Sequence, residues 1–94
     1  MNLETAQTRL RRKLEAVFSP ILLEIKDESA RHAGHAGARK GGETHFNVRI
    51  VSAVFKGMNQ VARHRAVYAA LGEDMKEGGI HALALQTLTP EEAA

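Results

Sequence analysis

The sequence predicts an α+β fold in two layers, with the element order helix, strand, strand, helix, strand (αββαβ). Apolar residues recur with helical spacing in two segments, and three other segments alternate apolar and polar residues. The helix between the second and third strands forms a crossover, so these two strands should be parallel. The first two strands are joined by a loop alone and should be antiparallel. We therefore expect a three-stranded mixed sheet with helices on one face.

Composition limits what the chain can be. Its 94 residues are enough for one domain, taken as residues 1–94, and they include no cysteine, so this chain contributes neither a disulfide nor a thiolate. The net charge of +2 is too small to indicate nucleic-acid binding by itself. No apolar run approaches the roughly 20 residues that span a bilayer. We expect a mature cytoplasmic protein, because Glu4 and Glu15 argue against an organellar presequence.

The first helix is expected to begin near Leu3, with Asn2 as its N-cap, and to end at Ser19-Pro20. One apolar stripe supports this helix: Leu3, Ala6, Leu10, Leu14, Val17 and Phe18. A basic cluster lies on its other positions, made of Arg9, Arg11, Arg12 and Lys13. Helix charge patterning favours a solvated surface for this cluster over a nucleic-acid patch.

Two strands follow the first helix. The first covers residues 21–27 and the second residues 45–51, with Phe46, Val48 and Ile50 pointing inward. The connection between them, residues 28–43, is rich in glycine and longer than the 2–5 residues typical of neighbouring strands. Loops of this length are usually functional or disordered, and this one carries His32 and His35.

The second helix is predicted over residues 60–71, capped by Asn59 and ended by Gly72, after a turn region at residues 52–58. Its expected buried stripe consists of Val61, Val67, Tyr68 and Leu71. A last strand follows Gly78-Gly79, with Leu83 and Leu85 on one face and His81 at its first position.

The residues alone leave the role of each histidine open. His81, at a strand start beside two glycines, suits either metal ligation or bonding to strand-end backbone groups. His32 and His35 are either ligands or solvated loop residues. His45 is expected at the surface, and His64 partly buried in the second helix.

Several strings together resemble the BolA family. They are Asp-Glu-Ser-Ala-Arg-His at 27–32, Glu-Thr-His-Phe at 43–46, Phe-Lys-Gly at 55–57, Arg-His-Arg at 63–65, Ile-His-Ala-Leu at 80–83 and Thr-Pro-Glu-Glu at 89–92. They occur in the family's order and cover about residues 10–92. The resemblance implies a fold like the type II KH domain, in agreement with the predicted order of elements.

The resemblance also implies a function. Members of this family pair with monothiol glutaredoxins that carry a Cys-Gly-Phe-Ser active site, and the two share a 2Fe-2S cluster with glutathione. The implied ligands from the BolA-like side are His81 and a residue of the loop between the first two strands, which matches His32, with His35 as the alternative within the same loop. Replacing two thiolates of such a cluster with two imidazoles raises its reduction potential. No stable cluster is expected on the isolated chain.

The competing function is nucleic-acid binding by a transcriptional regulator, since KH-like folds bind single strands. Its candidate contacts are Arg63, Arg65 and Lys56. Arg63 and Arg65 lie about 200° apart around a helix, so one should pair with an acid or a helix end while the other is left for a partner. The Gly-x-x-Gly string at 34–37 falls between strands rather than between helices, and the single strand-borne aromatic, Phe46, points inward, so no stacking platform is predicted. We expect no enzymatic turnover, and a homodimer in the absence of a partner remains an alternative.

Overall fold

The computed structural model describes residues 5–28, 45–75 and 82–94, apart from the side chains of Glu73, Asp74 and Ala82. Its elements follow the predicted order, with short 3-10 turns and a short final helix added: α1 (Ala6–Phe18), β1 (Leu22–Asp27), β2 (His45–Val51), η2 (Ala53–Phe55), α2 (Gln60–Leu71), η3 (Gly72–Met75), β3 (Ala82–Leu88) and α3 (Pro90–Ala93). None of the helices in these ranges combines the length and the apolar character that crossing a membrane requires.

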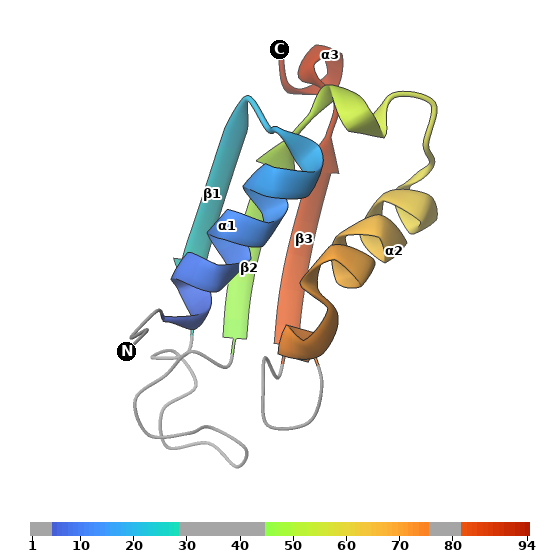
Figure 1. Ribbon diagram of the computed structural model, residues 1–94. Helices are drawn as coiled ribbons and strands as arrows, with labels where there is room; N and C mark the ends of the chain where they lie inside the picture. The colour runs from blue at the N-terminus through green and yellow to red at the C-terminus, as the bar shows by residue number, and fades with distance from the viewer. Residues whose placement is uncertain (1–4, 29–44, 76–81) are drawn as a thin grey trace.

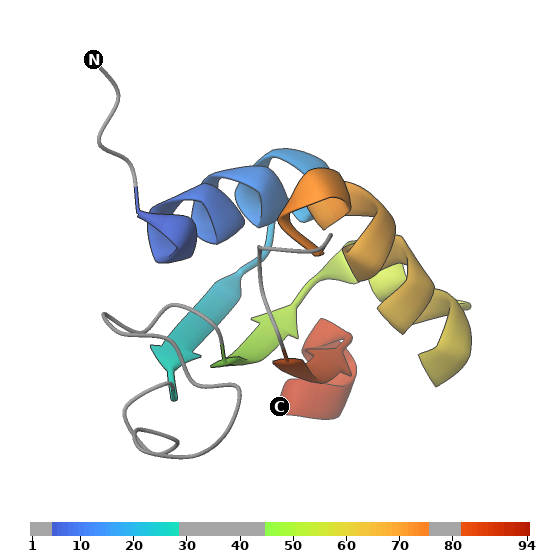
Figure 2. The same ribbon diagram turned by 90° about the horizontal axis from the view of Figure 1, so that it is seen from below.

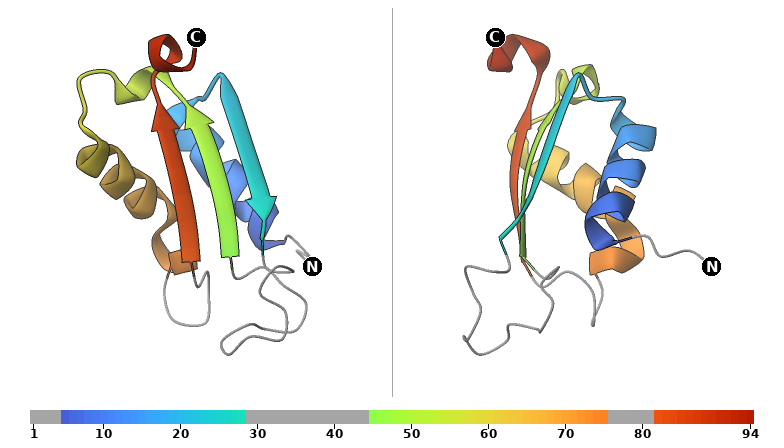
Figure 3. Two further views of the ribbon diagram at one scale, coloured as in Figure 1. Left: turned by 180° about the vertical axis from the view of Figure 1, so that it is seen from behind. Right: turned by 90° about the vertical axis from the view of Figure 1, so that its left-hand side faces the viewer.

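The sheet has the predicted mixed pairing. Its strand order is β1-β2-β3, with β1 antiparallel to β2 and β2 parallel to β3. Both α1 and α2 cover one face (Figure 1, Figure 2). The short helix α3 lies beyond the end of β3, on the side of the sheet away from α1 (Figure 3). Helix α3 was not among the elements expected from the sequence.

Helix α1 begins at Ala6 rather than near Leu3. Thr5 is its N-cap, because the Thr5 hydroxyl accepts a hydrogen bond from the Thr8 N–H at 3.1 Å. The helix ends at Ser19, which adopts a left-handed conformation and donates its N–H to the Glu15 carbonyl. The predicted cap Asn2 and the predicted first residue Leu3 lie outside the described residues.

The core lies between the helices and the inner sheet face. It contains the side chains that the alternation of β2 predicted to be inward, Phe46, Val48 and Ile50. The helices contribute Leu10, Leu14, Phe18, Val67 and Leu71, and Phe18 packs against Phe55 of η2 with their ring centroids 5.1 Å apart. Val17 was predicted to join this core but is 53% exposed, because the stripe of α1 runs through Leu14 and Phe18.

Helix α2 begins at the predicted cap, since the Asn59 side chain accepts from the Ala62 N–H at 2.8 Å. Its buried face differs from the predicted one: Val61 and Tyr68 are 60% and 40% exposed, and Arg63 is buried with Val67 and Leu71. These three residues are spaced four apart and therefore share one helix face. The prediction failed because it assigned the core face to apolar residues alone.

Part of the basic cluster is held against the backbone of other elements. Arg11 donates to the Leu23 carbonyl at 3.3 Å and Lys13 to the Leu71 carbonyl at 3.2 Å. Arg11 also forms a loose ion pair with Glu15. These cations therefore tie α1 to β1 and to the end of α2, which a purely solvated face would not do.

Candidate functional site

Three strand ends meet at one end of the sheet, the lower end in Figure 1. β1 finishes there at Asp27, and β2 and β3 begin there at His45 and Ala82. The topology requires this meeting: antiparallel pairing sets the end of β1 beside the start of β2, and parallel pairing sets the start of β3 on the other side of β2. At a strand spacing of about 4.8 Å, the ends of β1 and β3 lie roughly 10 Å apart.

Hydrogen bonds hold this end of the sheet in register. His45 is opposite Ala82, and Asp27 is opposite Phe46. The N–H of Glu28 donates to the His45 carbonyl at 2.8 Å, which extends the β1–β2 pairing by one more bond. From the helix layer, Gln7 Nε2 of α1 donates to the Ile25 carbonyl at 2.9 Å.

The three predicted ligands, His32, His35 and His81, lie outside the described residues, as do Gly78 and Gly79. Their positions in the sequence show which strand ends they are joined to. His81 is bonded directly to Ala82, and the segment that contains His32 and His35 joins Glu28 to His45. Both histidine-bearing segments are thus attached to the same end of the sheet.

The other two histidines are described. His45 is half-buried at the start of β2, where a surface position was predicted, and His64 is half-buried on α2, as predicted. Among the residues that the structure covers, no three His, Asp or Glu side chains gather in a way that could hold a metal ion.

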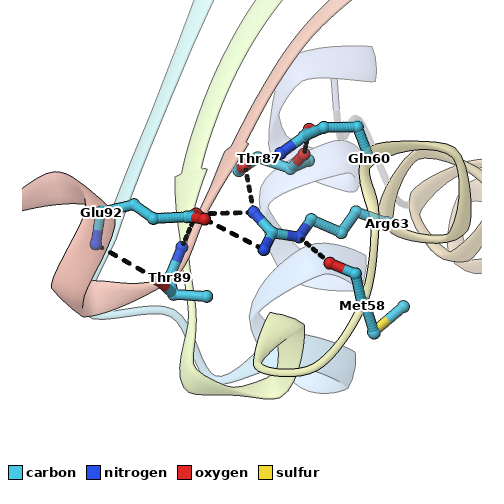
Figure 4. Close-up of polar contacts among 6 residues, drawn as sticks. All are labelled: Met58, Gln60, Arg63, Thr87, Thr89 and Glu92. Atoms are coloured by element: carbon cyan, nitrogen blue, oxygen red, sulfur yellow. Dashed lines mark hydrogen bonds and ion pairs between the residues drawn. The ribbon is translucent and has the colours of Figure 1, made fainter.

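A polar cluster around Arg63 occupies the opposite end of the sheet (Figure 4). The guanidinium donates from Nε to the Met58 carbonyl at 2.9 Å and from Nη1 to the Thr87 carbonyl at 3.0 Å. It also forms a two-pronged ion pair with Glu92, with Nη1–Oε1 at 2.6 Å and Nη2–Oε2 at 3.2 Å. The Arg63 side chain is only 6% exposed, and these partners compensate its burial.

Glu92 has a second role at the start of α3. Its carboxylate accepts from the Thr89 N–H at 2.8 Å, and its own N–H donates to the Thr89 hydroxyl at 3.2 Å, which together form a capping box. The hydrogen bond from Arg63, followed by that from the Thr89 backbone, lowers the pKa of Glu92 from 4.5 to about 2. Glu92 is therefore ionised at neutral pH and stays paired with Arg63.

The contacts of Arg63 show that the prediction of this residue as a nucleic-acid contact was wrong. Arg63 is buried and its guanidinium is engaged on all three nitrogens, so it does not present a cation to a nucleic acid. The expectation that one of the two helix arginines pairs with an acid is confirmed. Arg65 is exposed, and the exposed Lys56 pairs with Glu91 at 3.2 Å. The three proposed nucleic-acid contacts do not form one basic patch.

Sequence reasoning missed the Arg63–Glu92 cluster and the helix α3 that belongs to it. A signal was present in Thr89-Pro90-Glu91-Glu92, where a threonine precedes a glutamate by three residues and a proline stands at the first helical position. This string predicts a helix start at Thr89. It does not reveal that the same glutamate reaches a residue 29 positions earlier in the chain.

Comparison with known proteins identifies close relatives. The family model described as BolA-like protein matches residues 14–92. Over 93 residues the chain is 48% identical to the chloroplastic protein BOLA1 of Arabidopsis thaliana, covering 97% of this chain but 58% of that protein. It is 44% identical over 84 residues to the DNA-binding transcriptional regulator BolA of Escherichia coli, covering 89% of this chain and 75% of the relative.

A solved structure agrees with these sequence matches. The BolA domain of SufE1 from Arabidopsis thaliana is 44% identical to this chain and superposes with a TM-score of 0.82, covering 97% of this chain and 99% of that domain. That domain has the same mixed three-stranded sheet with helices, so the fold class predicted from the sequence is confirmed.

Proposed function

The chain belongs to the BolA family, and we propose that it is the partner of a monothiol glutaredoxin with which it holds a shared 2Fe-2S cluster. In this proposal the chain contributes His81 and one histidine of the segment between β1 and β2, His32 or His35. The glutaredoxin contributes its active-site cysteine together with glutathione. The role is binding, in iron–sulfur trafficking or iron and redox regulation, without catalytic turnover.

One observation of the described residues supports the proposal above all others. The two segments that carry the candidate ligands are joined to the same end of the sheet, at Glu28, His45 and Ala82. The sheet sets these attachment points within about two strand spacings, roughly 10 Å. Ligands of one metal centre must approach it to about 2 Å, so attachment at opposite ends of the domain would have argued against the proposal.

The donor set fits such a cluster. Two imidazoles on one iron of a 2Fe-2S cluster are a known alternative to two thiolates. The chain supplies histidines on both segments and has no cysteine, so any thiolate ligands must come from the partner. The same composition explains why the partner is required, because two imidazoles hold only half of the four protein ligand positions.

The proposal is tested by mixing the chain with a cluster-loaded monothiol glutaredoxin and recording visible circular dichroism. We expect a new spectrum for the mixture that is lost in His81→Ala. It should also be lost in either His32→Ala or His35→Ala, and that pair of variants identifies the second ligand. His64→Ala is the matched control, because it removes a histidine from α2 at a site outside the proposed ligand set. An unchanged spectrum in His81→Ala would rule the proposal out.

A second function is favoured by the name of one relative, the DNA-binding transcriptional regulator BolA of Escherichia coli. Of the three nucleic-acid candidates, Arg65 and Lys56 remain exposed. Fluorescence anisotropy with labelled DNA should then show an affinity that falls with salt and is weakened in Arg65→Gln. This affinity should persist in His81→Ala, whereas the glutaredoxin-dependent spectrum should not.

The proposal also covers the cellular compartment and the oligomeric state of the chain. We place it in the cytoplasm, and we include a homodimer as the state of the chain without its partner. Fractionation of cells that express the full protein tests the first point. Sedimentation of the chain with and without the glutaredoxin tests the second, since a homodimer should be replaced by a heterodimer when the partner is added.

A further inference from the structure

A pocket of about 340 Å³ lies at the end of the sheet opposite the histidine-bearing segments. It is lined by residues at the start of β1, the end of β2 and α3: Ile21, Leu22, Arg49, Val51, Pro90, Ala93 and Ala94. On β2, Arg49 and Val51 have the strand parity opposite to the inward residues Val48 and Ile50. The pocket therefore faces away from α1 and α2, on the side where α3 lies (Figure 3).

Helix α3 gives the pocket a fixed wall. Pro90 and Ala93 line it from α3, while Val51, only 1% exposed, lines it from the sheet. The Arg63–Glu92 ion pair and the Thr89–Glu92 capping box hold this short helix at the end of β3. On the other side Ile21 is 72% exposed, so the pocket is open to solvent along an apolar rim.

Arg49 carries the one charged side chain among these lining residues, and its hydrogen bonding is incomplete. Its Nε is buried and has no hydrogen-bond partner. Its Nη1 is 3.9 Å from Glu24 Oε1, which is an ion pair but too long for a hydrogen bond. Buried donors without partners are rare in native proteins. The Arg49 side chain as a whole is 39% exposed, so its terminal nitrogens can be reached from solvent.

We propose that this pocket binds a carboxylate that carries a short apolar chain. The Arg49 guanidinium pairs with the carboxylate through its two terminal nitrogens, Nη1 and Nη2, in the planar two-pronged geometry that arginine favours. The apolar chain packs against Leu22, Val51 and Ala93. A volume near 340 Å³ is at the small end of ligand pockets, which fits a ligand of few carbon atoms.

Two sources supply this chemistry, a free aliphatic acid and a peptide whose last residue is apolar and ends in a free carboxylate. Hexanoate represents the first, and a short peptide ending in Val-Leu the second. Each probe has a neutral match: hexanol for hexanoate and the C-terminal amide for the peptide. Binding by either acid in preference to its neutral match supports the proposal and identifies the source.

The experiment titrates each probe into the full chain and follows backbone amide resonances by NMR. We expect shifts centred on Leu22, Val51 and Ala93. Arg49→Gln should weaken acid binding by about tenfold, because it removes a charge-assisted pair. Arg49→Lys keeps the charge without the planar fork, so its affinity for the acids should lie between those of the original chain and Arg49→Gln. Arg65→Gln removes an exposed cation from α2 and should change nothing.

Two further variants separate the pocket from a general charge effect. Glu24→Gln removes the carboxylate that competes for Arg49, so it should tighten acid binding by about twofold to fivefold. Ala93→Leu fills the pocket from α3 and should abolish the shifts while leaving Arg49 in place. If neither acid binds, if the neutral matches bind as well as the acids, or if folded Arg49→Gln binds as tightly as the original chain, the proposal is wrong.

The pocket and the proposed cluster site lie at opposite ends of the sheet, so each can fail without the other. Loss of the glutaredoxin-dependent spectrum in His81→Ala says nothing about Arg49. Conversely, Arg49→Gln should leave that spectrum unchanged.

Discussion

Arg63 of α2 and Glu92 of α3 form a two-pronged ion pair, with nitrogen–oxygen distances of 2.6 and 3.2 Å, across 29 positions of sequence. The pair joins three parts of the molecule, because the same guanidinium also binds the carbonyls of Met58, before α2, and Thr87, in β3. The Cζ atom of Arg63 also lies over the ring of Phe55, 5.9 Å from the ring centroid. At the end of the sheet where β3 finishes, the buried Arg63 side chain and its polar partners therefore stabilise the fold in addition to apolar packing.

The first prediction concerns Arg63→Met, which keeps an unbranched apolar side chain and removes the donors. The carbonyls of Met58 and Thr87 lose their Arg63 donors, so we expect the free energy of unfolding to fall by about 2–3 kcal/mol. Urea denaturation measures this. Arg65→Met, two residues along the same helix but exposed, should stay within about 0.5 kcal/mol of the original chain. Equal effects of the two substitutions would contradict the role assigned to Arg63.

The second prediction concerns the pH dependence of stability. The pKa of Glu92 is lowered to about 2 in the folded chain, mainly by Arg63, against 4.5 for the unperturbed group. A lowered folded pKa stabilises the fold above the unfolded pKa, and this stabilisation is lost as pH falls from about 4.5 through about 2. The stability advantage of the original chain over Glu92→Gln should therefore shrink over that interval.

Denaturation curves recorded between pH 7 and pH 2 test this expectation. Glu91→Gln serves as the control, because it removes the same charge from the neighbouring residue of α3, whose carboxylate is 63% exposed and contacts Lys56. A constant difference between the original chain and Glu92→Gln at every pH would show that the charge of Glu92 does not contribute.

The third prediction concerns Ser52, which is fully buried after β2. Its hydroxyl donates to the Phe18 carbonyl at 2.5 Å and accepts from the Val54 N–H at 3.1 Å, so it links the end of α1 to η2. Ser52→Ala removes both bonds, and we expect a loss of about 1–2 kcal/mol in thermal or urea unfolding. Ser19→Ala, at an exposed position next to Phe18, should cost less. No measurable loss in Ser52→Ala would contradict this assignment.

The fourth prediction follows from the proposed function. Purified without a glutaredoxin, the chain should retain no stoichiometric, coloured 2Fe-2S cluster, because the two proposed histidine ligands supply only part of the ligand set. Iron and sulfide analysis together with visible absorbance measure this. Glutaredoxin loaded alone provides the reference spectrum. A stable cluster on the isolated chain would overturn the requirement for a partner.

Local patterns in the sequence were enough to predict the fold. The alternation of Phe46, Val48 and Ile50 identified the buried face of β2, and Asn59 and Gly72 marked the ends of α2. The crossover between β2 and β3 then required parallel pairing. These features depend on backbone geometry over a few residues, which a single segment contains in full. The meeting of three strand ends at one end of the sheet follows from the same topology.

Long-range contacts decided the rest. The sequence assigned Val61 and Tyr68 to the core of α2, and the structure buries Arg63 there instead. Burial of a charged side chain is favourable only when distant groups compensate it, here Thr87 and Glu92. The pocket beside Arg49 depends on the packing of α3 at the far end of the sheet, because its walls come from segments distant in the chain. Periodicity reports which face of an element is apolar, but only the packed structure brings together the partners that make a buried charge stable.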